Sequence, residues 1–249
     1  MDKPTRYYWA WITFCCCLLT STGCSLTPKA PRVTSQSSDG LRLRAIDQQT
    51  KAEACRLTAL ELAAAEKDEH AIAQFEQARQ LAPNLKGIAH PLAVLYDRQG
   101  RLDAAQREYE RALQEDPRNA DVLNDYGYFL YSRGDFAGAR QRLDQALARN
   151  AQHPKARINL AMVLAAEERY DEAFGHFEQA LGPAAAHHNI GLLQMRAGRQ
   201  QEAIAHLQQS AATDPSLRSD QLLATLSHTI SPESRIMPVG FTQTQDETR

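Results

Sequence analysis

The sequence lacks the short motifs that would point to a catalytic or metal centre. It has no GxSxG, no HExxH, no phosphate-cradling glycine loop and no pair of spaced CxxC motifs. Its eight histidines are scattered, and only His187 and His188 are adjacent. Neighbours on a helix point about 100° apart, which is poor geometry for sharing a metal ion. We therefore expect no enzyme activity, no metal, no cofactor and no small-molecule substrate.

Cysteine is rare after the first 24 residues, and the chain carries almost no net charge. Four of the five cysteines lie within the first 24 residues, which leaves only Cys55 in the rest of the chain. No intramolecular disulfide could form once a leader were removed, so the fold must be stabilised by its core alone. The net charge of −2 provides no basic excess. A nucleic-acid partner is therefore not expected.

No apolar run is long enough to cross a bilayer as a helix, which takes roughly 20 residues. The aromatic and aliphatic stretch near the start, Trp9 to Leu19, carries no charge and is preceded by Lys3 and Arg6, and this suits the apolar segment of a secretory signal. The small residues 21–23 lie directly before Cys24.

The start of the chain resembles a bacterial lipoprotein signal, which implies cleavage before Cys24 and acylation of that residue. Ser21 stands where this family normally has leucine. An ordinary signal cut elsewhere and an uncleaved N-terminal anchor remain alternatives. On the lipoprotein interpretation, residues 1–23 are the signal peptide and 24–50 are a lipidated N-terminus and disordered tether. The polar composition of 231–249 predicts a disordered tail.

An internal repeat occupies the middle of the chain. Alanines recur at a fixed spacing of 34 residues and then once after 30, and a bulky residue follows each alanine by four positions. A small residue precedes each alanine by twelve. The three sets are Ala71, Ala105, Ala139, Ala173 and Ala203; Phe75, Tyr109, Leu143, Phe177 and Leu207; and Ala59, Ala93, Gly127, Ala161 and Gly191. Periods of this size indicate a solenoid of helix pairs.

This register resembles the tetratricopeptide repeat over 52–217, inside a repeat domain spanning 51–217. It predicts an all-α solenoid of about five helix-turn-helix units at 52–85, 86–119, 120–153, 154–183 and 184–217. Leu222, Leu223, Leu226 and Ile230 share one face of the following segment. That segment, 218–230, is expected to be a capping helix.

The resemblance implies that the first helix of each unit lines a concave groove, where a protein or peptide segment would bind. The positions that it predicts for this groove are Asn124, Tyr128, Tyr131, Lys155, Met162, Leu192 and Met195, with His90, Val94, Asp97 and Arg98 from the second unit. Some of these side chains could instead pack against neighbouring helices. The type of array that grips a C-terminal carboxylate is not expected, because only Lys155 matches its required residues.

These observations favour a non-enzymatic interaction scaffold that is exported and held to a membrane by its lipid. Ser25 follows the cysteine where aspartate would favour inner-membrane retention, so the periplasmic face of the outer membrane is expected. The architecture resembles pilotin-type proteins of type IV or tight-adherence pilus assembly systems. The alternative is a general envelope adaptor for peptidoglycan enzymes or outer-membrane assembly, and an enzyme of unknown type is the remote one.

Overall fold

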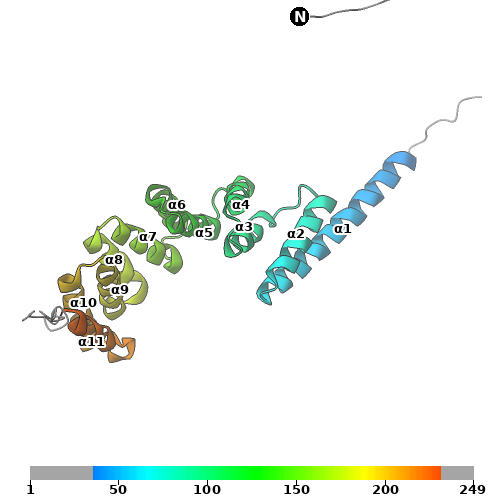
Figure 1. Ribbon diagram of the computed structural model, residues 1–249. Helices are drawn as coiled ribbons and strands as arrows, with labels where there is room; N and C mark the ends of the chain where they lie inside the picture. Colours follow the sequence, from blue (N-terminus) through cyan, green and yellow to red (C-terminus); the bar gives the residue numbers. More distant parts are fainter. Residues whose placement is uncertain (1–35, 231–249) are drawn as a thin grey trace, which may run out of the picture. The chain divides into compact units, whose positions relative to one another are not determined.

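The computed structural model describes residues 36–230, which form α-helices, one 3-10 helix and no strand (Figure 1). The chain divides at Arg44, and the packed repeat array lies in the unit that begins at Ala45. The helices are α1 (Gln36–Ala64), α2 (Asp68–Leu81), α3 (Ala89–Arg98), α4 (Leu102–Glu115), α5 (Ala120–Ser132), α6 (Phe136–Arg149), α7 (Pro154–Ala166), α8 (Tyr170–Leu181), α9 (Pro183–Arg196), α10 (Gln200–Thr213), η1 (Pro215–Leu217) and α11 (Ser219–Ile230).

The helices pack in sequence order, as the repeat pattern predicts. Each of α3, α5, α7 and α9 packs against the helix that follows it, and α5 also contacts both α3 and α7. The first helices of the second, third and fourth units therefore lie side by side. The prediction of an α-solenoid built from about five helix pairs is confirmed.

Small residues set the spacing between the two helices of a pair. A Cβ placed on Gly127 in α5 would lie 2.7 Å from Leu143 Cγ and 3.3 Å from the Ala139 backbone oxygen in α6. Gly191 in α9 meets the corresponding atoms of α10, Leu207 Cγ at 2.7 Å and Ala203 O at 3.2 Å. The two pairs cross with nearly the same geometry because the sequence repeats the same small residues there.

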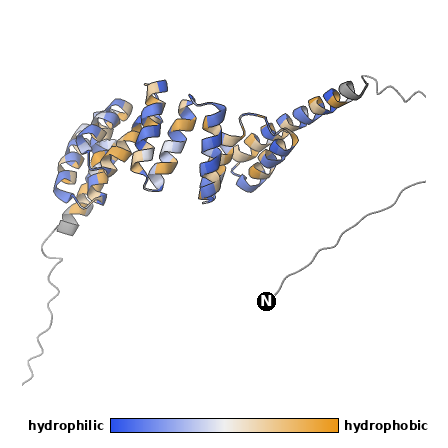
Figure 2. Cartoon of the chain, turned by 90° about the horizontal axis from the view of Figure 1, so that it is seen from above, coloured by the Kyte–Doolittle hydropathy of each residue, from blue (hydrophilic) through white to orange (hydrophobic). Residues whose placement is uncertain are grey.

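A main core runs from α1 to α9, and a separate cluster joins α10 to α11. The repeated alanines are fully buried, and the bulky residue of each unit fills the space beside them. Hydrophobic and hydrophilic positions are intermixed along the helices, consistent with one face of each helix turned to this core (Figure 2). Among residues 36–230, none of the helices combines the length and the apolar character needed to span a membrane.

The first helix extends further than the sequence predicts. Residues 24–50 are expected to be a disordered tether, yet α1 begins at Gln36, so the expectation is wrong for 36–50. Residues 40–50 are exposed, and packing does not hold them. Burial of Ala52 and Ala59 fixes the later turns. Once these turns are helical, each further residue toward the N-terminus adds one backbone hydrogen bond, so the helix extends. The ion pair between Lys51 Nζ and Asp47 Oδ2, at 2.7 Å, also stabilises it.

The C-terminal end of the array is covered by α11, as predicted. Leu226 is buried against Ala203 and Leu207 of α10, with Leu222 and Leu223 partly buried beside it. The Ser219 hydroxyl lies 2.8 Å from Ser210 Oγ, which ties the start of α11 to α10. The predicted signal peptide, Cys24 and the tail at 231–249 lie outside the described residues.

Candidate partner-binding groove

A cavity of about 390 Å³ opens between the first helices of the second, third and fourth units. We call it the groove cavity. Its lining residues are Val94, Asp97 and Arg98 of α3, Tyr109 of α4, Asn124, Asp125 and Tyr128 of α5, and Lys155, Ile158 and Asn159 of α7. Four helices from three units therefore build one site.

Six of the predicted groove positions line this cavity: Val94, Asp97 and Arg98 from the second unit, together with Asn124, Tyr128 and Lys155. The side chain of Tyr128 is the most exposed large aromatic of the described array, at 46%. Lys155 lies exposed at the start of α7. An exposed tyrosine beside a cavity offers an apolar ring and a polar tip to a partner, a combination common in interfaces.

The other five predicted positions, His90 among them, do not line the groove cavity. Tyr131 packs against the core, with its ring 5.8 Å from that of Phe136 and 6.3 Å from that of Tyr128, and burial raises the pKa of its hydroxyl. Met162 packs against the main core, and Met195 packs against the cluster formed with α11. Leu192 is partly buried. Tyr131, Met162 and Met195 therefore contribute to packing rather than to the lining of the groove cavity.

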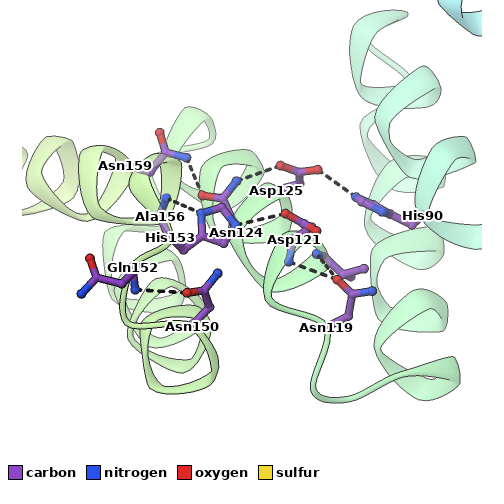
Figure 3. Close-up of polar contacts among 11 residues, drawn as sticks. His90, Asn119, Asp121, Asn124, Asp125, Asn150, Gln152, His153, Ala156 and Asn159 are labelled. Carbon is purple, nitrogen blue, oxygen red and sulfur yellow. Dashed lines mark hydrogen bonds and ion pairs between the residues drawn. The ribbon is translucent and has the colours of Figure 1, made fainter. Parts of the chain in front are cut away.

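A chain of polar contacts crosses the floor of the groove cavity (Figure 3). His90 Nε2 lies 2.8 Å from Asp125 Oδ2, and the Asn124 amide donates to Asp125 Oδ1 at 2.9 Å. The Asn159 amide in turn donates to Asn124 Oδ1 at 2.9 Å. We call these four residues the polar ladder. It joins α3, α5 and α7, and it explains why Asn124 is buried rather than free to contact a partner.

Sequence reasoning missed the polar ladder as a unit. The repeat pattern gives Asp125 and Asn159 no role of their own, and it places Asn124 on the groove surface. A usable signal is their spacing: His90 and Asp125 are 35 residues apart, as are Asn124 and Asn159. Polar residues recurring near the repeat length on successive first helices are neighbours in a solenoid, so hydrogen bonds between them could be predicted.

The junction between α5 and α7 is held by a second contact. His153 is buried, its Nδ1 accepts a hydrogen bond from the Ala156 amide at 3.2 Å, and its Nε2 lies 3.1 Å from Asp121 Oδ1 (Figure 3). The imidazole caps the N-terminus of α7 and links it to α5. The junction between α5 and α7, which both line the groove cavity, is therefore held by this contact as well as by the polar ladder.

The electrostatics of the groove cavity are set by two carboxylates and a buried phenol. Burial raises the pKa of Asp97, opposed by the positive charge of Arg133. Burial also raises the pKa of Tyr109, with further contributions from the charges of Asp125 and Asp97. The Tyr109 ring is stacked on Tyr126 at 5.2 Å and is held in place. Among residues 36–230, no three His, Cys, Asp or Glu side chains gather into a group that could hold a metal ion.

Models of the tetratricopeptide repeat match residues 98–157, 130–188 and 186–219. With the helix pairs and their shared crossing geometry, these matches define the class: the chain is a tetratricopeptide-repeat protein. Among curated proteins it is similar to the type IV pilus assembly protein PilF of Pseudomonas aeruginosa, 32% identical over 115 residues. That match covers 45% of this chain and 46% of the relative, so it spans about half the length of each.

Solved structures show the same fold. The P. aeruginosa PilF structure superposes with a TM-score of 0.55 at 21% identity, covering 74% of this chain and 91% of that one. The type IV pilus biogenesis factor PilW gives 0.57 at 19% identity, covering 72% and 89%. YrrB, described as a tetratricopeptide-repeat protein with an unusual peptide-binding site, gives 0.59 at 22% identity, covering 76% and 97%. The chain thus resembles type IV pilus assembly factors in sequence and fold.

Proposed function

We propose that this protein is a non-catalytic scaffold that captures a segment of another protein in the groove cavity. The observation that carries the proposal is the cavity itself, where exposed Tyr128 stands beside apolar Val94 and Ile158 over a pre-formed polar floor. A rigid concave site with an aromatic rim suits an extended or helical segment.

The proposed setting is pilus assembly in the cell envelope. The similarity to PilF over the repeats and the fold shared with PilW support this assignment. The peptide-binding site of YrrB supports a peptide-like occupant on the same type of fold. A general envelope adaptor would use the same groove to bind a different partner protein.

The proposed anchor is a lipid on Cys24, which would hold the array at the periplasmic face of the outer membrane. The support comes from sequence alone: a basic start, an apolar stretch and small residues before the cysteine. Met162 and Met195 then keep a packing role, and Tyr128 and Lys155 contact the partner.

Two variants test the proposal in cells. Cys24→Ala should abolish labelling by a fatty-acid analogue and release the protein from membranes, and labelling of the variant at the wild-type level would contradict the anchor.

Tyr128→Ala should reduce recovery of a pilus-assembly component by affinity purification about tenfold, since interface aromatics often contribute about 2 kcal/mol or more. Unchanged recovery, with Arg107→Ala on α4 as the control, would contradict the groove. Recovery of components of another envelope pathway instead would favour the general adaptor.

A further inference from the structure

We infer that the groove cavity binds a basic side chain, arginine or lysine, presented by an extended segment of the partner. The inference rests on the proposed function, because it names the chemistry that the groove selects. The observation behind it is charge complementarity: the cavity holds a half-buried carboxylate that makes no ion pair among residues 36–230, although the charge of Arg133 acts on it from a distance.

That carboxylate belongs to Asp97 on α3. Within residues 36–230, its carboxylate forms no hydrogen bond or ion pair, unlike several other partly buried charged groups. Arg79 with Glu108 at 2.6 Å is such a pair. Burial raises the pKa of Asp97, which indicates that its negative charge is poorly solvated. An incoming cation would supply the missing interaction.

Asp125 on α5 supplies a second negative charge to the same space. Asp97, Asp125 and Tyr109 all line the groove cavity, so the two carboxylates face a common region; burial raises the pKa of the Tyr109 phenol, and both charges raise it further. Asp125 is anchored by His90 and Asn124, at 2.8 Å and 2.9 Å. It is therefore a fixed charge, whereas Asp97 is the one left free to pair.

The rest of the lining suits the aliphatic part of a basic side chain. Val94 and Ile158 are apolar, and the rings of Tyr109 and Tyr128 present flat faces. Arginine and lysine bury their methylene stems on such surfaces while the charged group reaches a polar end, and guanidinium groups stack on aromatic rings. A neutral apolar residue would fill the same space but leave Asp97 unpaired.

The two cations at the cavity do not reverse this preference. Arg98 already forms an ion pair with Asp68, and Lys155 lies at the exposed rim. A charge in water is well solvated and screened by salt, so Lys155 gains little from an acidic partner. The half-buried Asp97 gains more from a cation.

The test uses the full-length protein and labelled peptides with one central residue flanked by leucines. The central residue is arginine, citrulline or glutamate, where citrulline has the shape of arginine without its charge. We expect the arginine peptide to bind about tenfold or more tightly than the citrulline peptide, with the difference shrinking as salt is added. Asp97→Asn should remove this difference, whereas Asp103→Asn, which neutralises an exposed acid on α4, should preserve it.

Equal binding of the arginine and citrulline peptides to wild-type protein would overturn the inference, as would tighter binding of the glutamate peptide. Lack of binding by the arginine peptide up to about 1 mM would overturn it too, because that limit corresponds to only about 4 kcal/mol. Loss of the arginine preference in Asp103→Asn would also overturn it. Tyr128→Ala separates this inference from the proposed function: peptides that all bind equally and all fail with Tyr128→Ala would leave the groove in place and remove its charge selectivity.

Discussion

At the scale of single residues, glycine and alanine determine how closely the helices of a unit approach. Gly127 and Gly191 lie in the third and fifth units, and each faces a leucine and a backbone oxygen of the following helix. Gly175 is also helical, in α8, but an added Cβ there would meet nothing within 4 Å. The three glycines therefore differ in what a methyl group would contact.

Replacing these glycines with alanine should have opposite effects. Gly127→Ala and Gly191→Ala should each lower the free energy of unfolding by about 1–3 kcal/mol, because the new methyl group overpacks the crossing. Gly175→Ala should raise it by about 0.5–1 kcal/mol, since alanine favours the helix and meets no neighbour. Chemical denaturation measures all three. A stabilised Gly127→Ala would show that the helices cross less closely than described.

At the scale of the element, the turn between paired helices needs a residue with positive φ. Glycine supplies it in three units, as at Gly134 with φ 80°, but Glu168 occupies the corresponding place between α7 and α8 with φ 62°. The left-handed conformation is unfavourable for a residue with a Cβ by about 1–2 kcal/mol. The Glu168 side chain adds only an exposed contact, 3.7 Å from Arg199 Nη1.

Glu168→Gly should therefore stabilise the protein by up to about 1 kcal/mol, because relief of the turn exceeds the loss of a solvent-exposed ion pair. Gly134→Ala is the matched control and should destabilise by a similar amount, since nothing within 4 Å obstructs its methyl group and only the backbone conformation is strained. Thermal unfolding measures both. Destabilisation by Glu168→Gly would mean that the side chain of Glu168 matters more than its backbone.

The helices of the fifth unit share a histidine pair whose charge state depends on pH. His187 Nδ1 of α9 lies 2.9 Å from His206 Nδ1 of α10, so one ring must donate and the other accept. Phe174 of α8 packs on His187 at 4.6 Å. Burial lowers the pKa of both histidines, and His187 lowers that of His206 further; Glu178 and Asp171 act in the opposite direction.

Stability should consequently fall on acidification. The unfolded chain binds protons near the ordinary histidine value of 6.5, whereas the folded pair resists protonation until a lower pH. This stabilisation is fully present above the ordinary histidine pKa of 6.5, and it is lost as the pH falls from there toward the lower pKa values of the folded pair. Between about pH 7.5 and about pH 5, His206→Gln should show a smaller loss of stability than wild type. His70→Gln, at an exposed site on α2, should match wild type; an unchanged loss in His206→Gln would contradict the assignment.

At the scale of the whole molecule, the fold could be predicted from the repeat spacing in the sequence, whereas most of the binding site could not. The spacing of Ala139 from Gly127 was sufficient to predict their helix crossing. The direction of Tyr131 was not predictable, because its ring could face the groove or Phe136 and only packing decides between them. The polar ladder depends on contacts between units, and α1 extends by local helix propagation into a segment whose composition suggested disorder.

The central claim is that a partner is captured in the groove cavity and not on the outer face of the array. The most direct measurement places a photo-crosslinking phenylalanine analogue at Tyr128 in one strain and at Arg107 of α4 in another, and irradiates living cells. The account predicts a crosslinked envelope protein from position 128, its yield reduced several-fold by Asp97→Asn, with little product from position 107. Equal crosslinking from both positions, or crosslinking from position 107 alone, would contradict it.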